Sequence, residues 1–363
     1  MIPIANLYYL LCYAWDVLPP RGAAPTAMEH LPDDDDDPTT VVGLLTHLLT
    51  TSLARQRRRG EPAAFELTET VGPTPRGQLR PGRLARLPRA AALGHLPSRH
   101  HRLTPDTPAR RLVAAALRLV LTPPLAADLP PDLRRAARAA LAPLTAVPAP
   151  ADLSAATFAA AVRTLPPTGT TAHLSLRAAE LLLLNALPAP AAATTARARR
   201  FHDFRADDGQ MGRLFEAFVR NFLRREQRAA AVSSDVLRWR GATATAPEAL
   251  PLLPVMRTDT TLTTPARRLV IDTKYYARPL AGSRFDGERL LAPHLYQLLA
   301  YLRNQPAAPD QRVEGMLLYP ATATSGNYRL DYQLDGYRVQ VRTLDLSRPW
   351  LQIRQSLLDL VAD

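Results

Sequence analysis

After residue 200 the sequence switches between helical and strand periodicity in an order that indicates a fold class. Apolar residues recur at helical spacing over 208–226, and a second helix is predicted at 290–303. Strands surround the second helix, and a helix at 349–361 closes the chain; the predicted strands are 234–240, 252–262, 267–276, 312–319, 327–333 and 337–344. This order predicts an α/β domain with a mixed central sheet flanked by helices.

Lysine occurs once in this chain, at position 274, whereas the other 44 of its 45 basic residues are arginine. An ammonium differs from a guanidinium in size and donor geometry, so positive charge alone does not explain Lys274. Alternate residues of a strand share a face, which places Asp272 beside Lys274. A carboxylate and an ammonium at the end of an apolar strand suit a metal-dependent phosphodiesterase. The alternative is an ordinary surface ion pair.

A second aspartate, Asp259, precedes Asp272 by thirteen residues, at the end of another predicted strand. A hairpin returning through residues 263–267 would bring the two carboxylates together, where they repel unless a cation lies between them. Mg²⁺ suits such a site because it binds through one or two carboxylates and keeps several waters. The carbonyl of Thr273 is a further candidate ligand, and Lys274 is expected to orient or deprotonate the attacking water.

Three more polar side chains lie on the two predicted helices. Glu216, on the predicted 208–226 helix, is a possible metal ligand or a partner of Arg220 one turn away. Gln297 and Tyr301 are four residues apart and therefore share a face of the 290–303 helix. That helix can equally be read as a leucine-rich core helix with ordinary polar flanks.

Composition restricts the surroundings in which this chemistry would take place. The net charge of +12 and the pI of about 10.4 favour a polyanionic partner, with nucleic acid first. Cys12 is the only cysteine, which excludes an internal disulfide and fits a reducing cytosol. The apolar segment 4–18 is too short and too polar to span a membrane and lacks the charges of a signal peptide. We therefore expect a cytoplasmic protein with no membrane association.

The length of 363 residues predicts about two domains. We place a mainly helical α+β domain at 1–190, a linker at 191–200 and the α/β domain at 201–363. Helices of the first domain are predicted at 4–18, 41–58, 107–121, 132–143, 154–163 and 175–187, with a strand at 64–70. Two basic stretches, 55–59 and 76–102, are candidates for contact with DNA or with an acidic protein surface.

The spacing of Asp259, Asp272 and Lys274 resembles the PD-(D/E)xK nuclease pattern, with threonine at 258 where many members carry proline. Some branches of that superfamily carry a Gln-x-x-x-Tyr pair on the DNA side of the site, and Gln297 and Tyr301 match it. Such nucleases often supply an acid from the first helix of the domain, which is the position of Glu216.

The whole chain resembles the McrC family, the nuclease subunit of McrBC restriction systems. Similar segments occur in matching order at 2–15, 106–111, 201–204, 211–226, 256–259, 272–276, 294–298 and 317–320. Two departures are Pro81, which interrupts a basic strand of the family, and Thr260, where an aliphatic residue is more usual.

The resemblance implies a division of labour between the two domains. The C-terminal domain would cut DNA containing modified cytosine with Mg²⁺, and the N-terminal domain would engage a ring of McrB-like AAA+ GTPase subunits and stimulate their GTP hydrolysis. GTP would bind the partner, because a phosphate-binding P-loop needs a lysine and Lys274 is the only one. Two alternatives are a stand-alone Mg²⁺-dependent nuclease of this fold and a non-catalytic activator of the GTPase. The intact set of Asp259, Asp272 and Lys274 argues against the second.

Overall fold

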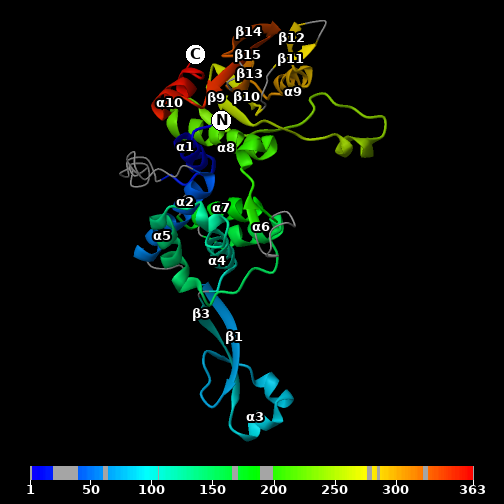
Figure 1. Cartoon of the computed structure of the whole chain (residues 1–363). Coiled ribbons are helices and arrows are strands. Elements are labelled where there is room, and N and C mark those ends of the chain that lie inside the picture. The colour runs from blue at the N-terminus through cyan, green and yellow to red at the C-terminus, as the bar shows by residue number, and fades with distance from the viewer. Residues whose placement is uncertain are drawn as a thin grey trace. The chain divides into compact units, whose positions relative to one another are not determined.

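The computed structural model describes most of the chain as two compact units (Figure 1). The described residues are 2–18, 40–59, 64–104, 106–165, 171–188, 199–275, 280–283, 287–321 and 326–362. One unit is Val42–His202, and the other joins Met1–Val41 to Asp203–Asp363. The break between them falls just after the predicted linker, most of which lies outside the described residues. None of the described helices is both long enough and apolar enough to cross a bilayer.

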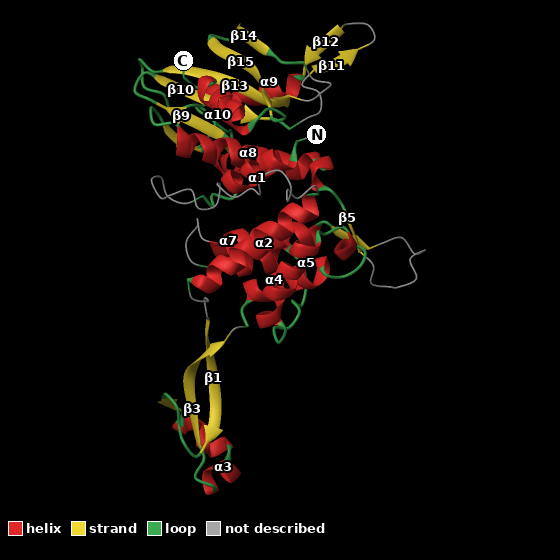
Figure 2. Cartoon of the chain, turned by 60° about the vertical axis from the view of Figure 1, so that its left-hand side comes forward, coloured by secondary structure: helices red, strands yellow, loops and turns green. Residues whose placement is uncertain are grey.

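Helix α4 is the central helix of the Val42–His202 unit and packs against α5, α6 and α7 (Figure 2). The side chain of Thr107 caps it by accepting a hydrogen bond from the backbone N–H of Arg110, and Pro108 occupies its first turn at no cost in hydrogen bonds. Leu112 and Leu117 on its apolar face are fully buried. The helices of the unit agree with the predicted ones within a few residues: α2 (Val41–Arg58), α4 (Pro108–Val120), α5 (Pro131–Leu141), α6 (Ala155–Arg163) and α7 (Thr171–Leu184). The short strands β4 (Ala186–Pro188) and β5 (Arg199–Phe201) pair antiparallel at its end.

A β-ribbon between α2 and α4 is longer than the sequence predicts. β1 (Ala64–Gly72) and β3 (Leu96–Thr104) pair antiparallel along their whole length. The short strand β2 (Gln78–Leu79) adds to β3, and a 3-10 helix, Pro81–Arg86, and α3 (Pro88–Ala92) complete the connection. Hydrophobic periodicity predicted only β1. The sequence of β3, Leu-Pro-Ser-Arg-His-His-Arg-Leu-Thr, lacks an alternation of apolar residues.

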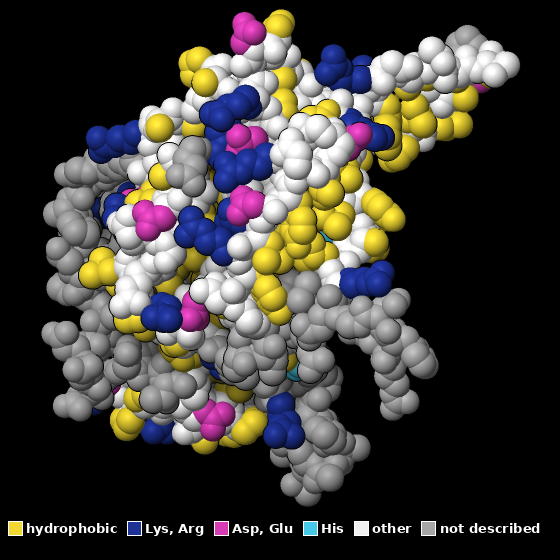
Figure 3. Space-filling view, turned by 90° about the horizontal axis from the view of Figure 1, so that it is seen from above, with side chains coloured by type: hydrophobic (Ala, Val, Ile, Leu, Met, Phe, Trp, Pro, Cys, Tyr) yellow, Lys and Arg dark blue, Asp and Glu magenta, His cyan; other side chains and the backbone are white. Residues whose placement is uncertain are grey.

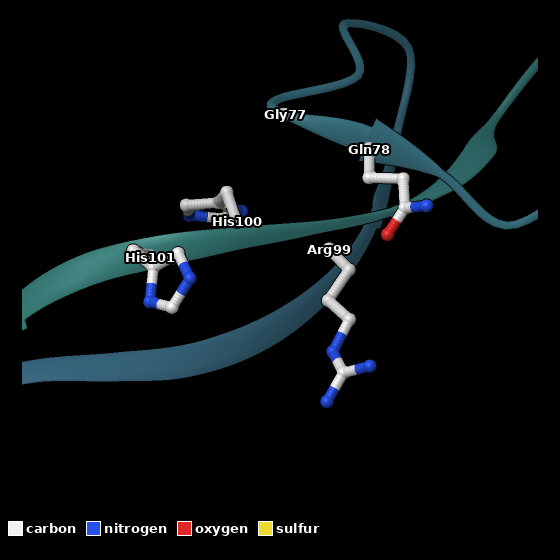
Figure 4. Close-up of a pocket in the computed structure, with 5 residues that line it drawn as sticks. All are labelled: Gly77, Gln78, Arg99, His100 and His101. Carbon is white, nitrogen blue, oxygen red and sulfur yellow. The ribbon is translucent and has the colours of Figure 1, made fainter.

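Gly77 lies where two backbone segments of this ribbon approach each other closely. Its φ is +73°, and a Cβ at this position would lie 2.5 Å from the carbonyl oxygen of Arg99, so that only glycine fits. An open pocket of about 400 Å³ lies beside it and is lined by Gly77, Gln78, Arg99, His100 and His101 (Figure 4). Arg99 and His101 point to one side of β3 and His100 to the other, as the alternation of a strand requires.

The second unit is built on a six-stranded mixed sheet, as the sequence predicts. The strand order is β14-β15-β13-β10-β9-β6. β10, β13 and β15 are parallel to one another, whereas β14, β9 and β6 each pair antiparallel with their neighbours. The strands are β6 (Ala231–Ser233), β9 (Thr260–Thr263), β10 (Arg267–Thr273), β13 (Arg312–Ala321), β14 (Arg329–Leu334) and β15 (Tyr337–Asp345).

Helices cover both faces of this sheet (Figure 2). Val270 of β10 belongs to the core under α9 (Ala292–Arg303), together with Leu298 and Leu302. Gly315 lets α9 approach β13, since a Cβ there would lie 2.9 Å from both leucines. α8 (Asp208–Glu226) and α10 (Trp350–Asp359) pack on the opposite face. The even-numbered side chains of β10 therefore face α9, and the odd-numbered ones face α8.

The first helix belongs to this second unit. α1 (Ile4–Ala14) packs along α8, where the ring of Tyr13 lies 5.2 Å from that of Phe222 and 5.5 Å from that of Trp350. The hydroxyl of Tyr13 donates to Glu226 at 2.9 Å. The predicted assignment of this helix to the N-terminal domain is therefore wrong, because its aromatic face completes a core with helices from the far end of the chain.

Two predicted strands before β10 are also shorter than expected. The predicted strand 252–262 consists of β8 (Met256–Arg257), which pairs with β7 (Val236–Leu237), and of β9, which pairs with β10. The chain changes partner between them, at Asp259. A hairpin of β11 (Leu280–Ser283) and β12 (Gly287–Leu290) follows β10 and was not predicted. Tyr276, the predicted end of β10, lies outside the described residues.

Candidate active site at the end of β10

The register of β9 on β10 brings Asp259 and Asp272 together. The last residue pair between the two strands is Thr260 opposite Ile271. The next position in the same register places Asp259 opposite Asp272. The backbone N–H and the hydroxyl of Thr273 both donate to Oδ2 of Asp259, at 2.8 and 2.7 Å. The predicted hairpin is thus present, and it holds the Asp259 carboxylate against the end of β10.

Lys274 links Asp272 to helix α9. Its Nζ lies 2.9 Å from Oδ2 of Asp272 and donates to Oε1 of Gln297 at 2.7 Å. The amide of Gln297 donates in turn to the hydroxyl of Tyr301 at 2.6 Å. The Asp272 side chain is 0% exposed and that of Lys274 only 14%, so this is no surface ion pair. The four predicted residues form one continuous polar chain on the α9 side of the sheet.

Glu216 approaches the same place from α8. Its Oε1 accepts a hydrogen bond at 2.7 Å from Nη1 of Arg220, and that nitrogen also donates to the backbone carbonyl of Asp259 at 3.0 Å. The charge of Glu216 raises the pKa of both Asp259 and Asp272. Both predicted roles of Glu216 are compatible with this position: it pairs with Arg220, and it lies within the electrostatic field of the two aspartates.

Acidic charge is in excess at this end of the sheet. The pKa of Asp272 is raised to about 7, mainly by burial and also by the charge of Asp259, against the opposing effect of Lys274. Burial also raises the pKa of Asp259, against the hydrogen bonds that it accepts from Thr273. A buried and a half-buried carboxylate beside each other, both with raised pKa values, are the arrangement that a divalent cation relieves.

The donor set fits Mg²⁺ better than a metal that needs a full protein cage. Oδ1 of Asp272 is buried and has no hydrogen-bond partner among the described residues, which leaves it available to a cation. In the part of the chain that the structure describes, no three His, Cys, Asp or Glu side chains lie close enough together to hold a metal. Mg²⁺ needs only one or two carboxylates, which Asp259 and Asp272 supply, whereas Glu216 would first have to leave Arg220.

One buried residue near this site was not predicted from the sequence. His294 lies in the first turn of α9, and its Nδ1 is 2.8 Å from the hydroxyl of the buried Tyr319. Burial and, to a smaller extent, the charge of Lys274 lower the pKa of His294 to about 4, so the ring is neutral at pH 7. The available signal was its spacing, since His294 precedes Gln297 by three residues and Tyr301 by seven and thus shares their helical face.

A known restriction enzyme matches the sequence of this chain over nearly its whole length. No protein-family model matches the chain. Its sequence is 26% identical over 366 residues to the type IV methyl-directed restriction enzyme EcoKMcrBC of Escherichia coli (strain K12), and the match covers 99% of this chain and 97% of that protein. The chain is a homologue of the McrBC restriction enzymes. The resemblance predicted from the sequence is confirmed.

Two solved structures of McrBC assemblies match this chain, and the first shares its fold. One is the half-complex from a tetradecameric assembly of Thermococcus gammatolerans McrB AAA+ hexamers with bound McrC, matched with a TM-score of 0.51 and 17% identity over 99% of this chain and 76% of that one. A cryo-EM structure of the Thermococcus gammatolerans McrBC complex matches at a TM-score of 0.40 and 19% identity, over 62% of this chain and 60% of that one. The first likeness extends the relationship to the fold of nearly the whole chain.

Proposed function

We propose that this chain is the Mg²⁺-dependent endonuclease subunit of a restriction system that attacks DNA containing modified cytosine. The reaction is hydrolysis of a phosphodiester bond. The observation that carries the proposal is the convergence of Asp259, Asp272 and Lys274 at the end of β10, with two raised carboxylate pKa values beside one ammonium. The relationship to a methyl-directed restriction enzyme supports modified DNA as the substrate.

The charges around the site suit one divalent cation and one phosphodiester. Glu216, Asp259 and Asp272 bring three negative charges when ionised, and Arg220 and Lys274 bring two positive ones, which leaves a net charge of −1. A bound Mg²⁺ changes that balance to +1, the complement of a single scissile phosphate. The chemistry that Mg²⁺ would supply there is activation of the attacking water and neutralisation of charge on the phosphate.

The side chains of the site have separate roles in this scheme. Thr273 fixes one oxygen of Asp259 through two hydrogen bonds and so directs the other oxygen toward the cation site. Lys274, held between Asp272 and Gln297, has a donor left with which to orient the attacking water. Tyr301 fixes the amide of Gln297 and, through it, the position of the ammonium. The chain from Tyr301 to Asp272 therefore sets the direction of attack.

An AAA+ GTPase is the proposed partner, with GTP bound by the partner alone. One solved assembly with a similar fold consists of McrB AAA+ hexamers with bound McrC, and the single lysine of this chain leaves no residue for a P-loop. We assign engagement of the ring and stimulation of its GTPase to the Val42–His202 unit, which contains the basic stretches 55–59 and 76–102.

The test is an affinity pull-down of the tagged chain from its native host with Mg²⁺ and a non-hydrolysable GTP analogue. We expect an AAA+ GTPase that is retained with the analogue and lost without it. The recovered complex should cut cytosine-methylated plasmid in Mg²⁺, and it should leave unmethylated plasmid intact. EDTA should stop cleavage, and Lys274→Arg in the tagged chain should strongly reduce it.

The two alternatives give different results in the same experiment. A stand-alone nuclease would bring down no NTPase, and the purified chain would cut DNA with Mg²⁺ alone. A non-catalytic activator would stimulate the partner's GTPase equally well with and without Asp272→Asn, and no combination would cut DNA.

A further inference from the structure

A projecting segment beside the site exposes an unusual amount of apolar surface. This apolar finger, residues 236–257, runs from β7 to β8 and contains a 3-10 helix, Pro247–Leu252 (Figure 1). Six of the thirteen large apolar side chains that the described part of the chain exposes belong to it: Val236, Trp239, Leu250, Leu252, Leu253 and Val255. Contiguous apolar surface of this kind marks a contact site.

The base of the apolar finger is fixed to the elements that carry the site. Leu237 and Met256 pair across it and are buried in the same core cluster as Tyr301. The hydroxyl of Thr258 accepts a hydrogen bond from the backbone of Asp235 at 2.8 Å, one residue before Asp259. The apolar finger therefore begins and ends next to the two-aspartate site.

The apolar finger is also tied to the C-terminal end of α9. The indole N–H of Trp239 donates to the carbonyl of Pro254 at 2.9 Å and ties the two sides of the apolar finger together. The backbone N–H of Arg240 donates to Asn304 at 2.7 Å, and its guanidinium donates to the carbonyl of Gln305 at 3.1 Å. Because Asp272, Lys274 and Gln297 also lie on the α9 side of the sheet, the apolar finger and the site share one side of the unit.

Charge and shape together indicate the kind of surface that the apolar finger meets. Three exposed arginines, Arg238, Arg240 and Arg257, accompany a single acid, Glu248, so its net charge is +2. It projects from the unit with hydrophobic side chains along it, at the right of Figure 3. A projecting apolar segment flanked by cations is complementary to a groove walled by phosphates, where apolar wedges enter between base steps.

We propose that the apolar finger inserts Leu252 and Val255 into a groove of the duplex that the neighbouring site cuts. These side chains are 82% and 65% exposed. The inference rests on the proposed nuclease function for its substrate, and it adds a second contact that holds and distorts the DNA at a fixed distance from Asp259. The flanking arginines meet the phosphates on either side of the wedge.

The experiment uses the full chain carrying Asp272→Asn, so that bound DNA is not cut. Leu252→Ser with Val255→Ser is compared with Leu351→Ser, an equally exposed leucine (76%) on α10 at the other face of the sheet. Binding to a duplex that contains 2-aminopurine is measured across a series of salt concentrations. We expect the double variant to raise Kd about tenfold and to lose the rise in fluorescence that reports unstacking, with Leu351→Ser unchanged.

Salt dependence separates the apolar contact from the cationic one. The double variant should leave the slope of log K against log[salt] unchanged, whereas Arg238→Gln and Arg257→Gln should each reduce that slope by about one unit. An unaltered Kd and fluorescence in the double variant overturns the proposal. A shift in the monomer–dimer equilibrium of the double variant by sedimentation, with DNA binding unchanged, overturns it in favour of a second copy of the chain.

The two proposals fail separately. A wild-type chain that never cuts DNA, alone or with its partner, overturns the nuclease proposal. If the same chain still binds duplex through Leu252 and Val255, the apolar finger remains a DNA contact.

Discussion

At its first residues strand β10 carries two arginines, and each of them has a carboxylate partner. Nε of Arg267 donates to Glu314 at 3.0 Å, and Arg268 lies 2.5 Å from Asp235. All four side chains are largely buried. Buried charges that each have a partner of opposite sign, as here, are the ordinary way in which a sheet tolerates ionised groups in its interior.

At the opposite end of β10 the acids outnumber the bases. Asp272 has Lys274 as its only ion-pair partner among the described residues, and Asp259 stands directly beside it. The pKa of Asp272 is raised to about 7, mainly because the group is buried and also because of the charge of Asp259. The difference teaches where to look for function: the start of β10 is balanced and stabilises the fold, whereas its end is unbalanced and destabilises the fold unless something else binds there.

The largest expected effect comes from removing the unbalanced acid. Asp272→Asn should reduce cleavage by the complex about a thousandfold, because the cation loses one of its two carboxylates and several kcal/mol of charge stabilisation with it. Stimulation of the partner's GTPase should persist. Loss of that stimulation along with cleavage would show that the two units do not divide the work as proposed.

Glu314→Gln at the balanced end is the matched control. It leaves Arg267 buried without its carboxylate and should lower the free energy of unfolding by about 3 kcal/mol. Cleavage per folded molecule should stay as in the wild type. If Glu314→Gln instead removed cleavage without destabilising the chain, the contrast between the two ends of β10 would be lost.

Lys274→Arg tests whether the unbalanced end needs an ammonium or only a charge. We expect cleavage to fall about a hundredfold with folding intact, since a guanidinium fork cannot keep the 2.7 Å bond to Gln297 and also reach Asp272 from the same point. Gel assays of plasmid nicking and circular dichroism measure the two quantities. Wild-type turnover in Lys274→Arg would remove the argument drawn from the only lysine.

Periodicity predicted most of this architecture, and its failures have physical causes. The helices and the β9–β10 hairpin were visible because their apolar faces repeat at 3.6 or 2 residues. Strand β3 was not predicted, because most of its residues are polar and show no apolar alternation. The position of α1 could not be predicted either, because its packing against Trp350 is a contact between opposite ends of the chain.

The site divides in the same way. Asp259, Asp272 and Lys274 followed from strand alternation and spacing. Gln297 and Tyr301 were singled out by the resemblance to a nuclease pattern, and helical spacing placed them on one face. The neutral state of His294 and the exposure of the apolar finger depend on tertiary burial, which a single sequence does not encode locally. The bond from Arg220 to the backbone of Asp259 is likewise set by how α8 lies on the sheet.

The unbalanced end should also be visible in the pH dependence of stability without metal. The pKa of Asp272 is raised in the folded chain from 3.8 to about 7, so the folded state binds the extra proton between these values. Its contribution to stability is therefore present below pH 4 and is lost as the pH rises through about 7. In EDTA at pH 8, Asp272→Asn should be more stable than the wild type by on the order of 2 kcal/mol.

The pH dependence of stability has to be compared between the wild type and Asp272→Asn, because His294 changes the stability in the opposite direction as the pH rises. Its folded pKa is lowered to about 4, so its contribution is lost as the pH falls below its unfolded value. Thermal unfolding of both proteins at pH 5 and pH 8, with and without Mg²⁺, separates the two. Equal pH profiles for the two proteins would contradict the raised pKa, and Mg²⁺ should stabilise only the wild type at pH 8.

Glu216→Gln has the smallest expected effect and decides how far the unbalanced region extends. If Glu216 joins the cation site, the variant should raise the Mg²⁺ concentration for half-maximal cleavage about tenfold while changing the maximal rate little. Arg220→Gln serves as the matched control, because it frees Glu216 from its 2.7 Å partner and should lower that Mg²⁺ concentration. Identical Mg²⁺ titrations in wild type and both variants would confine the site to Asp259 and Asp272 and leave Glu216 as a structural partner of Arg220, similar to the pairs at the start of β10.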